Sequence, residues 1–257
     1  MTSQSEFRPL PDLKGQVAVI SGGTGAIGYA CAKRLAGLGA TCVLLGLNAT
    51  PQKVDKFLSD LDGGGHLFIR VDVTQSASLL HAAEEVQREF GKVNILVNSA
   101  GSTRAIPVHD LQALHDDLFD EMLRVNLRSV FSTIRAFAPL LQESGDGLVL
   151  NISSIASFTG VGSNLAYVAA KAGLDAIGIA LARSLAPGVR VLTVAPGVVD
   201  TGFVPGRGAD FNDKVAATLP LRRIGTADDV AATVEACATH LRYATGIRLV
   251  VDGGRHL

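Results

Sequence analysis

The sequence predicts an α/β protein in which one mostly parallel, doubly wound sheet of seven strands carries helices on both faces. Three observations support this fold class: seven short apolar segments recur along the chain, helical patterns separate them, and a glycine-rich turn follows the first apolar segment. Alternation of strand and helix through a whole chain is typical of parallel sheets joined by right-handed crossovers. The 257 residues contain no linker-like segment, so we expect a single domain.

The predicted strands are continuous apolar runs rather than alternating patterns, which indicates that helices cover both faces of the sheet. They are VAVI at 17–20, CVLL at 42–45, LFIRV at 67–71, NILV at 94–97, LVLNI at 148–152, RVLTVA at 190–195 and LVV at 249–251. The clearest helix spans 76–90, where apolar residues share one face and Gly91 is a stop signal. Ligands of such sheets bind at the carboxyl ends of the strands, so the segments that follow the strands are the candidates for a site.

The ends and loops divide the chain into three parts. Residues 1–14 form a polar N-terminal tail without the apolar segment of a signal peptide, and residues 15–257 form the domain itself. Residues 200–226 are a long irregular stretch rich in glycine and proline. Loops of that length in a compact domain are usually lids or binding segments, so we expect residues 200–226 to enclose a substrate.

Composition excludes several classes of function. Hydrophobic residues make up 47% of the chain, charged residues make up 18%, and the net charge is −1, which is unlike a disordered protein or a basic nucleic-acid binder. No run approaches the roughly 18 apolar residues of a membrane span. We therefore expect small molecules and copies of this chain as partners, with no role for nucleic acid or a membrane.

Cysteine and histidine usage predicts neither disulfides nor a metal site. Cys31, Cys42 and Cys237 are odd in number, widely spaced and set in apolar patterns, so we expect buried thiols and a cytoplasmic location. The six histidines show no metal-ligand spacing: His109 and His115, for example, are six apart, unlike a helical pair at i and i+4.

The segment SGGTGAIG at 21–28 lies between the first predicted strand and the first predicted helix. Gly23, Gly25 and Gly28 fit the G-x-G-x-x-G spacing, in which glycines allow a tight turn, close approach of the backbone to a pyrophosphate and close helix-to-strand packing. N–H groups at a helix N-terminus are unpaired and lie at the positive end of the helix dipole, where a phosphate can bind. The alternative is a merely flexible loop, but the position of the turn favours a dinucleotide-binding domain of Rossmann type.

Three residues near the end of the fifth predicted strand have the chemistry of an acid/base site. Ser154 lies just beyond that strand, and Tyr167 and Lys171 are four apart in a helical pattern, hence neighbours on one face. A tyrosine of ordinary pKa, about 10, is roughly 0.1% ionised at pH 7, so its use as a base requires about 4 kcal/mol of phenolate stabilisation. An ammonium about 4 Å away supplies an interaction of about that size at an effective dielectric of 20. A serine hydroxyl could hold a carbonyl or alcohol oxygen while the proton moves.

The dyad spacing alone is a weak signal, because Tyr29 and Lys33 share it in the helix after the glycine-rich turn. Only the second dyad has a hydroxyl, that of Ser154, thirteen residues before its tyrosine; the corresponding residue before Tyr29 is Gln16. We expect Tyr29 and Lys33 to serve packing and solvation.

With these motifs in place, the chain resembles the classical short-chain dehydrogenases/reductases over essentially its full length, among them 3-oxoacyl-acyl carrier protein reductases and other ketone/alcohol oxidoreductases. Besides the glycine-rich turn, the resemblance is carried by Asp72 in VDV, NSAG at 98–101, VNL at 125–127, NISS at 151–154, YVAAK at 167–171, APGVVDT at 195–201 and VVDGG at 250–254. One residue departs from the pattern: Ala26 stands where the classical branch usually has glycine.

The resemblance implies a catalytic tetrad of Asn126, Ser154, Tyr167 and Lys171. Tyr167 would be the general acid in reduction and the base in oxidation, and Ser154 would orient the substrate oxygen. Lys171 would also hold the nicotinamide ribose, and Asn126 would support a proton-relay water. The structural alternative for Asn126, that it merely satisfies helix backbone, stays open, as do a strand end for Asn98 and a turn for Gly101.

The resemblance also implies a homotetramer and a set of cofactor-binding residues that would contact the adenine, the pyrophosphate, the central cofactor wall and the carboxamide. In chain order they are Gly22, Gly23, Thr24, Gly25, Ala26, Ile27, Gly28, Gly46, Leu47, Asn48, Asp72, Val73, Asn98, Ser99, Ala100, Gly101, Tyr167, Lys171, Pro196, Gly197, Val199 and Thr201.

The expected cofactor is NAD(P)(H), and the segment LLGLNAT after the second predicted strand bears on which form is used. An acidic residue about twenty positions after the turn normally accepts the ribose 2′-OH of NAD, whereas arginine there favours NADP. Gly46 removes the carboxylate that would repel a 2′-phosphate, and Asn48, Thr50 or Lys53 could bond to one. Leu47, however, stands where many NADP-using relatives have arginine, so the residues lean only slightly to NADP(H).

Two classes of function remain at this stage. The first is an oxidoreductase that interconverts a secondary alcohol and a ketone by hydride transfer; the second is a non-catalytic nucleotide-binding redox sensor or scaffold on the same fold. Substrate identity is less readable: Arg104 and Arg207 could receive an anionic substrate or could be solvated loop residues. By family analogy the pocket is expected to include Phe158, Val161, Val198, Phe203 and Val204.

Overall fold

The seven predicted strands form one parallel sheet in the computed structural model, which describes residues 12–206, 208 and 210–257. The predicted tail therefore falls mostly outside the described residues. The strand order is β3-β2-β1-β4-β5-β6-β7, and the predicted doubly wound fold is confirmed. The strands are β1 (Val17–Ser21), β2 (Thr41–Gly46), β3 (Leu67–Arg70), β4 (Ile95–Asn98), β5 (Gly147–Ile152), β6 (Val189–Pro196) and β7 (Arg248–Val251).

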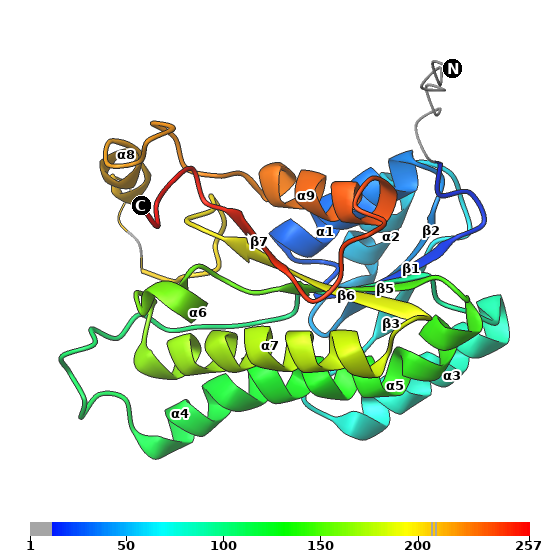
Figure 1. Cartoon of the computed structure of the whole chain (residues 1–257), viewed down its shortest axis with the longest axis horizontal. Helices are drawn as coiled ribbons and strands as arrows, with labels where there is room; N and C mark the ends of the chain where they lie inside the picture. The colour runs from blue at the N-terminus through cyan, green and yellow to red at the C-terminus, as the bar shows by residue number, and fades with distance from the viewer. Residues whose placement is uncertain (1–11, 207, 209) are drawn as a thin grey trace, which may run out of the picture.

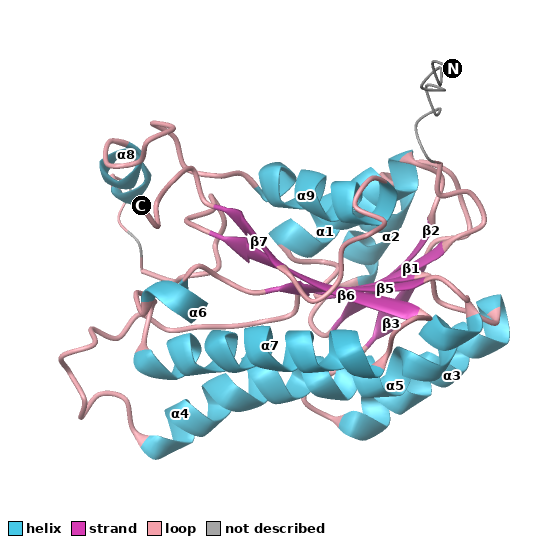
Figure 2. Cartoon of the chain, viewed as in Figure 1, coloured by secondary structure: helices cyan, strands magenta, loops and turns pink. Residues whose placement is uncertain are grey.

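Helices cover both faces of the sheet (Figures 1 and 2), with α1, α2 and α9 on one side and α3, α5 and α7 on the other. Their bounds are α1 (Ala26–Gly37), α2 (Pro51–Ser59), α3 (Ser76–Phe90), α4 (Asp116–Leu123), α5 (Ser129–Glu143), α6 (Ala156–Thr159), α7 (Leu165–Ser184), α8 (Phe211–Ala216) and α9 (Ala227–Thr239). A π-helical turn, η1 (Arg124–Arg128), joins α4 to α5.

The continuous apolar strands produce two cores, because successive side chains of a strand point to opposite faces of the sheet. In β1, Ala18 and Ile20 join the core under α1 and α9, whereas Val17 and Val19 join the core under α3, α5 and α7. All five residues of β1 are buried. This two-sided burial is the physical reason that the strand reads as an apolar run and not as an alternating pattern.

The helix predicted at 76–90 is α3, and its end is set by a glycine. Gly91 adopts a left-handed conformation, with φ of 73°, and its N–H donates to the carbonyl of Gln87. A left-handed residue at this position is favourable for glycine because it has no Cβ.

Helix α7 is more apolar than the sequence analysis expected of any segment. An 18-residue window of α7 has a mean hydropathy of 1.5. By length and composition alone, the helix could cross a membrane, and 39% of that window is buried in the structure. The physical reason is that α7 lies on the sheet and on neighbouring helices and is built largely from alanine, glycine and leucine. Such a composition is equally typical of a helix in a protein core.

The segment 200–226 is less irregular than predicted, because it contains α8 and because a bridge between Val199 and Gly225 brings its ends together. Helix α8 has only six residues, too few for a periodic apolar pattern to reveal it. Arg207, one of the arginines considered as an anion receptor, lies outside the described residues.

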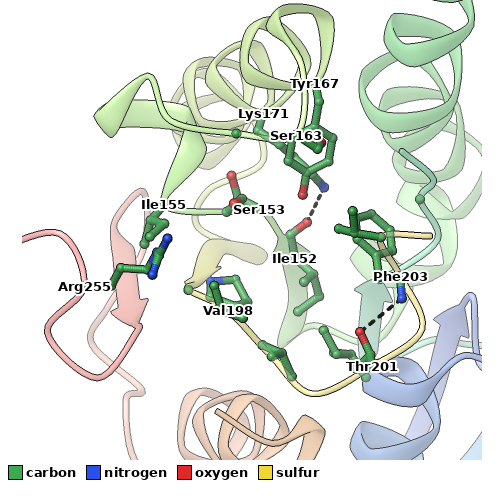
Figure 3. A pocket seen from close by; sticks show the side chains of 18 of the residues that line it. Ile152, Ser153, Ile155, Ser163, Tyr167, Lys171, Val198, Thr201, Phe203 and Arg255 are labelled. Atoms are coloured by element: carbon green, nitrogen blue, oxygen red, sulfur yellow. Dashed lines mark hydrogen bonds between the residues drawn. The ribbon is translucent and has the colours of Figure 1, made fainter. Parts of the chain in front are cut away.

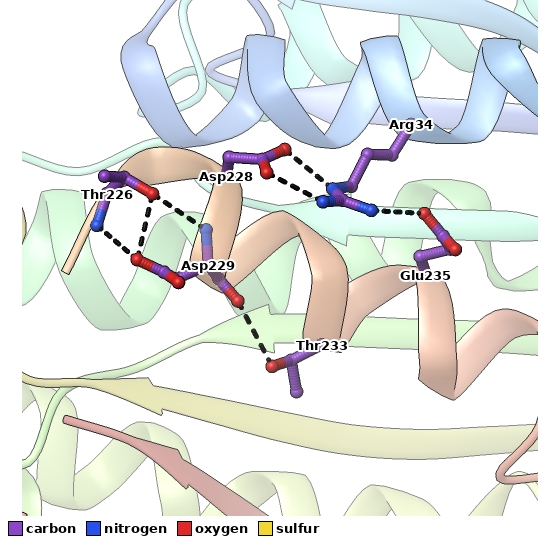
Figure 4. Close-up of polar contacts among 6 residues, drawn as sticks. All are labelled: Arg34, Thr226, Asp228, Asp229, Thr233 and Glu235. Carbon is purple, nitrogen blue, oxygen red and sulfur yellow. Dashed lines mark hydrogen bonds and ion pairs between the residues drawn. The ribbon is translucent and has the colours of Figure 1, made fainter. Parts of the chain in front are cut away.

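Ionic and capping contacts fix the far end of this segment to the body of the domain (Figure 4). Thr226 and Asp229 form a capping box at the start of α9, in which the Thr226 side chain accepts from the Asp229 N–H and the Asp229 carboxylate accepts from the Thr226 N–H. Arg34 on α1 donates two bonds of 2.7 Å to Asp228 and one of 2.8 Å to Glu235. Segment 200–226 thus ends at a firmly held helix.

Cys31, Cys42 and Cys237 are buried and free, as predicted. Burial raises the pKa of the Cys31 and Cys42 thiols to about 12, so both stay protonated and unreactive near neutral pH.

Candidate active site

A cavity of about 1410 Å³ opens at the carboxyl ends of β1, β4, β5, β6 and β7. This is the edge at which parallel sheets of this type bind ligands. The cavity is lined by many of the residues predicted for the site, namely Gly22, Gly25, Ala26, Ile27, Ser99, Ala100, Gly101, Ser154, Tyr167, Lys171, Pro196, Gly197, Val199 and Thr201.

One end of the cavity is made of backbone from the glycine-rich turn. Gly22 has a φ of +66°, and a Cβ added to it would lie 2.8 Å from the Ala100 backbone. Gly25 is the N-cap of α1 and provides no side-chain cap, so the first N–H groups of that helix face the cavity beside Ala26 and Ile27. This cradle suits a pyrophosphate, because unpaired N–H groups and the positive end of a helix dipole both attract an anion.

The substitution at Ala26 does not close this cradle. Ala26 is exposed and lines the cavity, so its methyl group occupies open space at the first turn of α1. Gly28, by contrast, is buried, and a Cβ there would collide with the carbonyl of Gly22. In this chain, therefore, residue 28 of the motif must be glycine, whereas residue 26 can carry a methyl group.

Other predicted cofactor residues do not line the cavity; they are Gly23, Thr24, Gly28, Gly46, Leu47, Asn48, Asp72, Val73 and Asn98. Gly46 has a packing reason of its own, because a Cβ would lie 2.9 Å from the Thr24 hydroxyl. The Asp72 carboxylate accepts from the N–H and the hydroxyl of Thr74, at 2.9 and 2.7 Å. Asn98 donates to Asn151 at 2.9 Å, which ties β4 to β5.

Tyr167 and Lys171 lie close together on the wall of the cavity (Figure 3), on the first turns of α7. Helix α7 starts beside them because the N-cap Asn164 accepts from the Tyr167 N–H at 2.7 Å. The Lys171 ammonium lies 5.7 Å from the centroid of the Tyr167 ring and donates to the Ile152 carbonyl at 2.8 Å. Burial lowers the pKa of Lys171 to about 8, opposed by the negative charge of Asp175.

Tyr29 and Lys33, the second pair with this spacing, lie in surroundings that differ from those of Tyr167 and Lys171. Both side chains bond to the same exposed carboxylate, that of Asp60, at 2.9 and 3.0 Å. Burial and the Asp60 hydrogen bond raise the pKa of Tyr29 to about 12, which is the wrong direction for a base near neutral pH. The expectation that this pair serves packing and solvation fits these contacts.

Two adjacent serines face the cavity at the end of β5. Ser154, the predicted substrate-orienting residue, accepts from the Ala156 N–H at 3.1 Å and lines the cavity. Ser153 also lines the cavity, and its buried hydroxyl has no hydrogen-bond partner among the described residues. Ser153 was not predicted from the sequence, although the doubled serine of NISS was a signal that could have identified it.

Asn126 is held in the π-helical turn and does not line the cavity. Its amide donates to the carbonyls of Ser102 and Met122 at 2.9 and 3.0 Å, and its oxygen accepts from the Ser102 N–H at 3.2 Å. The side chain therefore fastens the loop after β4 to η1, and a Cβ on Gly101 would lie 2.8 Å from the Asn126 oxygen. These contacts match the backbone-satisfying alternative, so a contribution to a proton relay would have to come from its backbone.

A polar network behind Lys171 was not predicted. Asp175, one helical turn further along α7, accepts from Ser157 at 2.5 Å and from Arg248 on β7 at 2.8 Å. The Arg248 guanidinium also lies 4.1 Å from the centroid of the Phe158 ring. An acidic residue in an otherwise apolar helix was the available signal, but its partners could not be identified without the fold.

Comparisons with known proteins agree with this geometry. A family model described as enoyl-(acyl carrier protein) reductase matches residues 22–256. A protein of the granaticin polyketide synthase of Streptomyces violaceoruber is 36% identical over 94% of this chain and 96% of its own length. The 3-oxoacyl-[acyl-carrier-protein] reductase of Escherichia coli is 33% identical over 96% of this chain and 99% of its own. A dehydrogenase/reductase structure from Sinorhizobium meliloti is 32% identical, with a TM-score of 0.85 over 95% of this chain and 96% of that one.

Proposed function

Because the chain belongs to the short-chain dehydrogenase/reductase family, whose members are NAD(P)(H)-dependent oxidoreductases, we propose that it interconverts a secondary alcohol and a ketone with Tyr167 as general acid and base. The observation that carries the proposal is the pairing of Tyr167 with a buried lysine on the wall of the cavity. The relatives named for ketoacyl reduction support a carbonyl substrate.

The glycine-rich turn and the cavity wall would hold NAD(P)H, which would supply the hydride for the carbonyl carbon in the reductive direction. The Tyr167 hydroxyl gives its proton to the carbonyl oxygen, and the Ser154 hydroxyl holds that oxygen during the transfer. A charged Lys171 stabilises the phenolate that remains, and solvent returns the proton. Oxidation runs through the same residues in reverse.

The buried position of Lys171 sets a pH window for this chemistry. With a pKa of about 8, Lys171 carries its charge below that pH and loses it as the pH rises through that value. Loss of the ammonium removes the stabilisation of the phenolate that reduction leaves on Tyr167, so we expect the rate of reduction to decline on the alkaline side of about pH 8.

The direct test compares Tyr167→Phe with wild-type protein on a panel of ketones, following NADPH absorbance. We expect Tyr167→Phe to lower kcat by roughly 10²–10⁴-fold, the usual contribution of a general acid, with nucleotide affinity unchanged. Tyr29→Phe is the matched control, since it removes the same hydroxyl from the same spacing in another helix and should leave kcat unaltered. Equal rates in the two variants would remove Tyr167 from the mechanism.

The second candidate function, a nucleotide-binding sensor without turnover, makes a different prediction. It would bind NADPH and reduce none of the ketones, and Tyr167→Phe would then have no activity to change. Retention of Ser154, Tyr167 and Lys171 on one cavity favours the enzyme.

For the cofactor we propose NADP(H). Leu47 stands where many NADP-using relatives have arginine, but Arg70 supplies a positive charge at the same loop. Arg70 at the end of β3 donates to the carbonyls of Leu47 and Ala49, at 2.5 and 3.0 Å, so a guanidinium lies at the loop expected to meet the ribose. A cation there favours a 2′-phosphate. Fluorescence titration should give tighter binding of NADPH than of NADH, and Arg70→Met should reduce that difference; tighter binding of NADH would reverse the assignment.

We also propose a homotetramer, located in the cytoplasm. Phe131 on α5 and Ile179 on α7 are 43% and 47% exposed on neighbouring helices of the outer face, which is consistent with contact between copies. Light scattering coupled to size exclusion should give the mass of four chains, and a stable monomer would contradict this. Cysteine alkylation in cells would test the reducing location.

A further inference from the structure

We propose that Arg255 binds an anionic group of the substrate at the mouth of the cavity, so that the substrate is a ketone or alcohol carrying a carboxylate or phosphate at a distance from its reacting carbon. This inference rests on the proposed oxidoreductase function and names the substrate class of the same site. The anion receptors considered from the sequence, Arg104 and Arg207, are not the residues that the cavity presents: Arg104 does not line it, and Arg207 lies outside the described residues.

The position of Arg255 separates it from the cofactor end of the cavity. Arg255 follows β7 and lines the cavity, and Figure 3 shows its guanidinium beside Ile155, on the side of Ser153 and Val198. In the sheet order, β7 lies four strands from β1 and two from β5. At a strand spacing of about 4.8 Å, β7 is roughly 19 Å from β1, which carries the glycine-rich turn, and roughly 10 Å from β5, which lies beside Lys171. An anion at Arg255 therefore belongs to the substrate and not to the pyrophosphate.

The charge of the cavity wall supports the same conclusion. Among the described residues that line the cavity there is no aspartate or glutamate, and its full positive charges are those of Lys171 and Arg255. Lys171 donates to the Ile152 carbonyl, whereas Arg255 takes part in none of the ion pairs found among the described residues. A guanidinium that faces a cavity wall without an acidic side chain can give its paired N–H donors to a ligand.

The carboxylate of Asp252, in the same turn as Arg255, is engaged by hydrogen bonds within that turn. Its carboxylate accepts from the Gly254 N–H at 2.9 Å, from the His256 N–H at 2.8 Å and from the His256 ring at 2.8 Å. Asp252 has a side chain only 4% exposed. A Cβ on Gly254, whose φ is +86°, would lie 2.6 Å from the Pro220 ring, so the turn is packed against segment 200–226. Arg255 thus belongs to a turn that hydrogen bonds and packing hold in place.

Ile155 and Val198 lie on the side of the cavity toward Arg255, with the Ser153 hydroxyl between Arg255 and Tyr167 (Figure 3). Val161 and Phe203 add further apolar side chains to the cavity wall, and the Phe203 ring centroid lies 6.0 Å from that of Tyr167. A substrate that satisfies both ends would place its carbonyl at Tyr167, an apolar spacer along these side chains and its anion at Arg255. Short 2-oxo acids, in which the carboxylate adjoins the carbonyl, do not span this arrangement.

The test uses Arg255→Met, with Arg104→Met as the matched control that removes the same charge outside the cavity. The probes are straight-chain oxocarboxylates of increasing length beside their methyl esters, and acetoacetyl-coenzyme A beside the neutral acetoacetyl-N-acetylcysteamine thioester. We expect Arg255→Met to lower kcat/KM by about 10–100-fold for the anionic member of a pair, which corresponds to one charged hydrogen bond. The neutral member should change by less than about twofold, because it forms no charged hydrogen bond with Arg255, and Arg104→Met should change neither.

The outcomes separate the sources of the anion. A loss confined to the oxocarboxylates identifies a carboxylate substrate, and a loss confined to the coenzyme A thioester identifies the phosphate of a carrier arm; both support the inference. An equal loss on charged and neutral probes, or no loss, overturns it.

A binding measurement keeps the inference separate from the proposed function. Calorimetric titration of octanoate and of coenzyme A into the protein saturated with NADP⁺ requires no turnover. Weaker binding of either to Arg255→Met supports the anion site even if no ketone is reduced, in which case only the proposed reaction fails. Unchanged binding of both overturns the anion site even if ketones are reduced.

Discussion

At the end of the cavity that follows β1, the wall is backbone: a Cβ on Gly22 would lie 2.8 Å from the Ala100 backbone, and the start of α1, which has no side-chain cap, supplies N–H groups. At the end that follows β6 and β7, the wall is made of side chains, among them Phe203, Val198 and Arg255, carried by turns and by segment 200–226. Tyr167 and Lys171 lie between the two ends on one rigid helix.

This difference teaches which property each end can vary. A backbone cradle binds what every member of the family shares, and most substitutions there fail because a Cβ does not fit. A wall of exposed side chains tolerates change and decides which substrate is accepted. Substitutions at the first end should therefore act on nucleotide binding, and substitutions of Val198, Phe203 or Arg255 at the second should act on substrate choice.

The largest effect is expected at the junction of the two ends. Lys171→Met should lower kcat by roughly 10²–10⁴-fold, because it removes the charge that stabilises the phenolate, and it should also weaken nucleotide binding. Stopped-flow kinetics and fluorescence titration on the same samples give both quantities. Lys33→Met is the control, and similar losses in the two lysine variants would show that position on the cavity does not matter.

The next effect separates the ends. Gly22→Ala should weaken NADPH binding by about tenfold or more and destabilise the fold by about 1–3 kcal/mol, because the new Cβ meets the Ala100 backbone at a positive φ. Isothermal titration measures the NADPH affinity, and urea unfolding measures the free energy of unfolding. Gly64→Ala, where a Cβ meets nothing within 4 Å, should change neither. Normal NADPH affinity in a folded Gly22→Ala protein would refute the backbone cradle.

A subtler effect concerns the charge on Lys171. Asp175 raises the pKa of Lys171 against the effect of burial, so Asp175→Asn should lower that pKa below about 8 and move the alkaline decline of kcat/KM to lower pH. A pH profile from about pH 6 to about pH 9 measures the shift. Asp228→Asn, which removes a carboxylate paired with Arg34 on the far side of the sheet, should leave the profile in place. A uniform loss of rate without displacement would mean that Asp175 is only structural.

The smallest effect is expected on the substrate side. Phe203→Ala should raise KM for bulky apolar ketones by about five- to thirtyfold, because it removes an apolar contact of about 1–2 kcal/mol, and it should leave NADPH affinity unchanged. Because Phe203 is 38% exposed, its loss should cost little stability. Comparing KM for large and small ketones tests this prediction. A parallel loss of NADPH binding would contradict the separate roles of the two ends of the cavity.

The sequence was most informative where function depends on local backbone geometry. SGGTGAIG specifies its turn within eight residues, and Tyr167 and Lys171 are neighbours through helical spacing alone. The seven strands were also predictable, because two-sided burial leaves continuous apolar runs.

Features that join distant segments were not predictable in the same way. Arg248 and Asp175 pair across 73 residues, and Asn126 reaches the loop at Ser102 across 24. Arg255 faces the cavity only because β7 is placed at the edge of the sheet beside β6. No local pattern encodes these meetings, and only the assembled fold brings the partners together.

The central claim, direct hydride transfer at this cavity, is tested most directly by isotope transfer. NADPH carrying deuterium on one face of C4 of the nicotinamide, prepared for each face in turn, is turned over with an accepted ketone, and the product is examined by mass spectrometry. The account predicts that one of the two labelled forms places its deuterium on the carbinol carbon of the alcohol and that the other places none there. Deuterium that appears in the solvent, or an unlabelled alcohol from both forms, would contradict it.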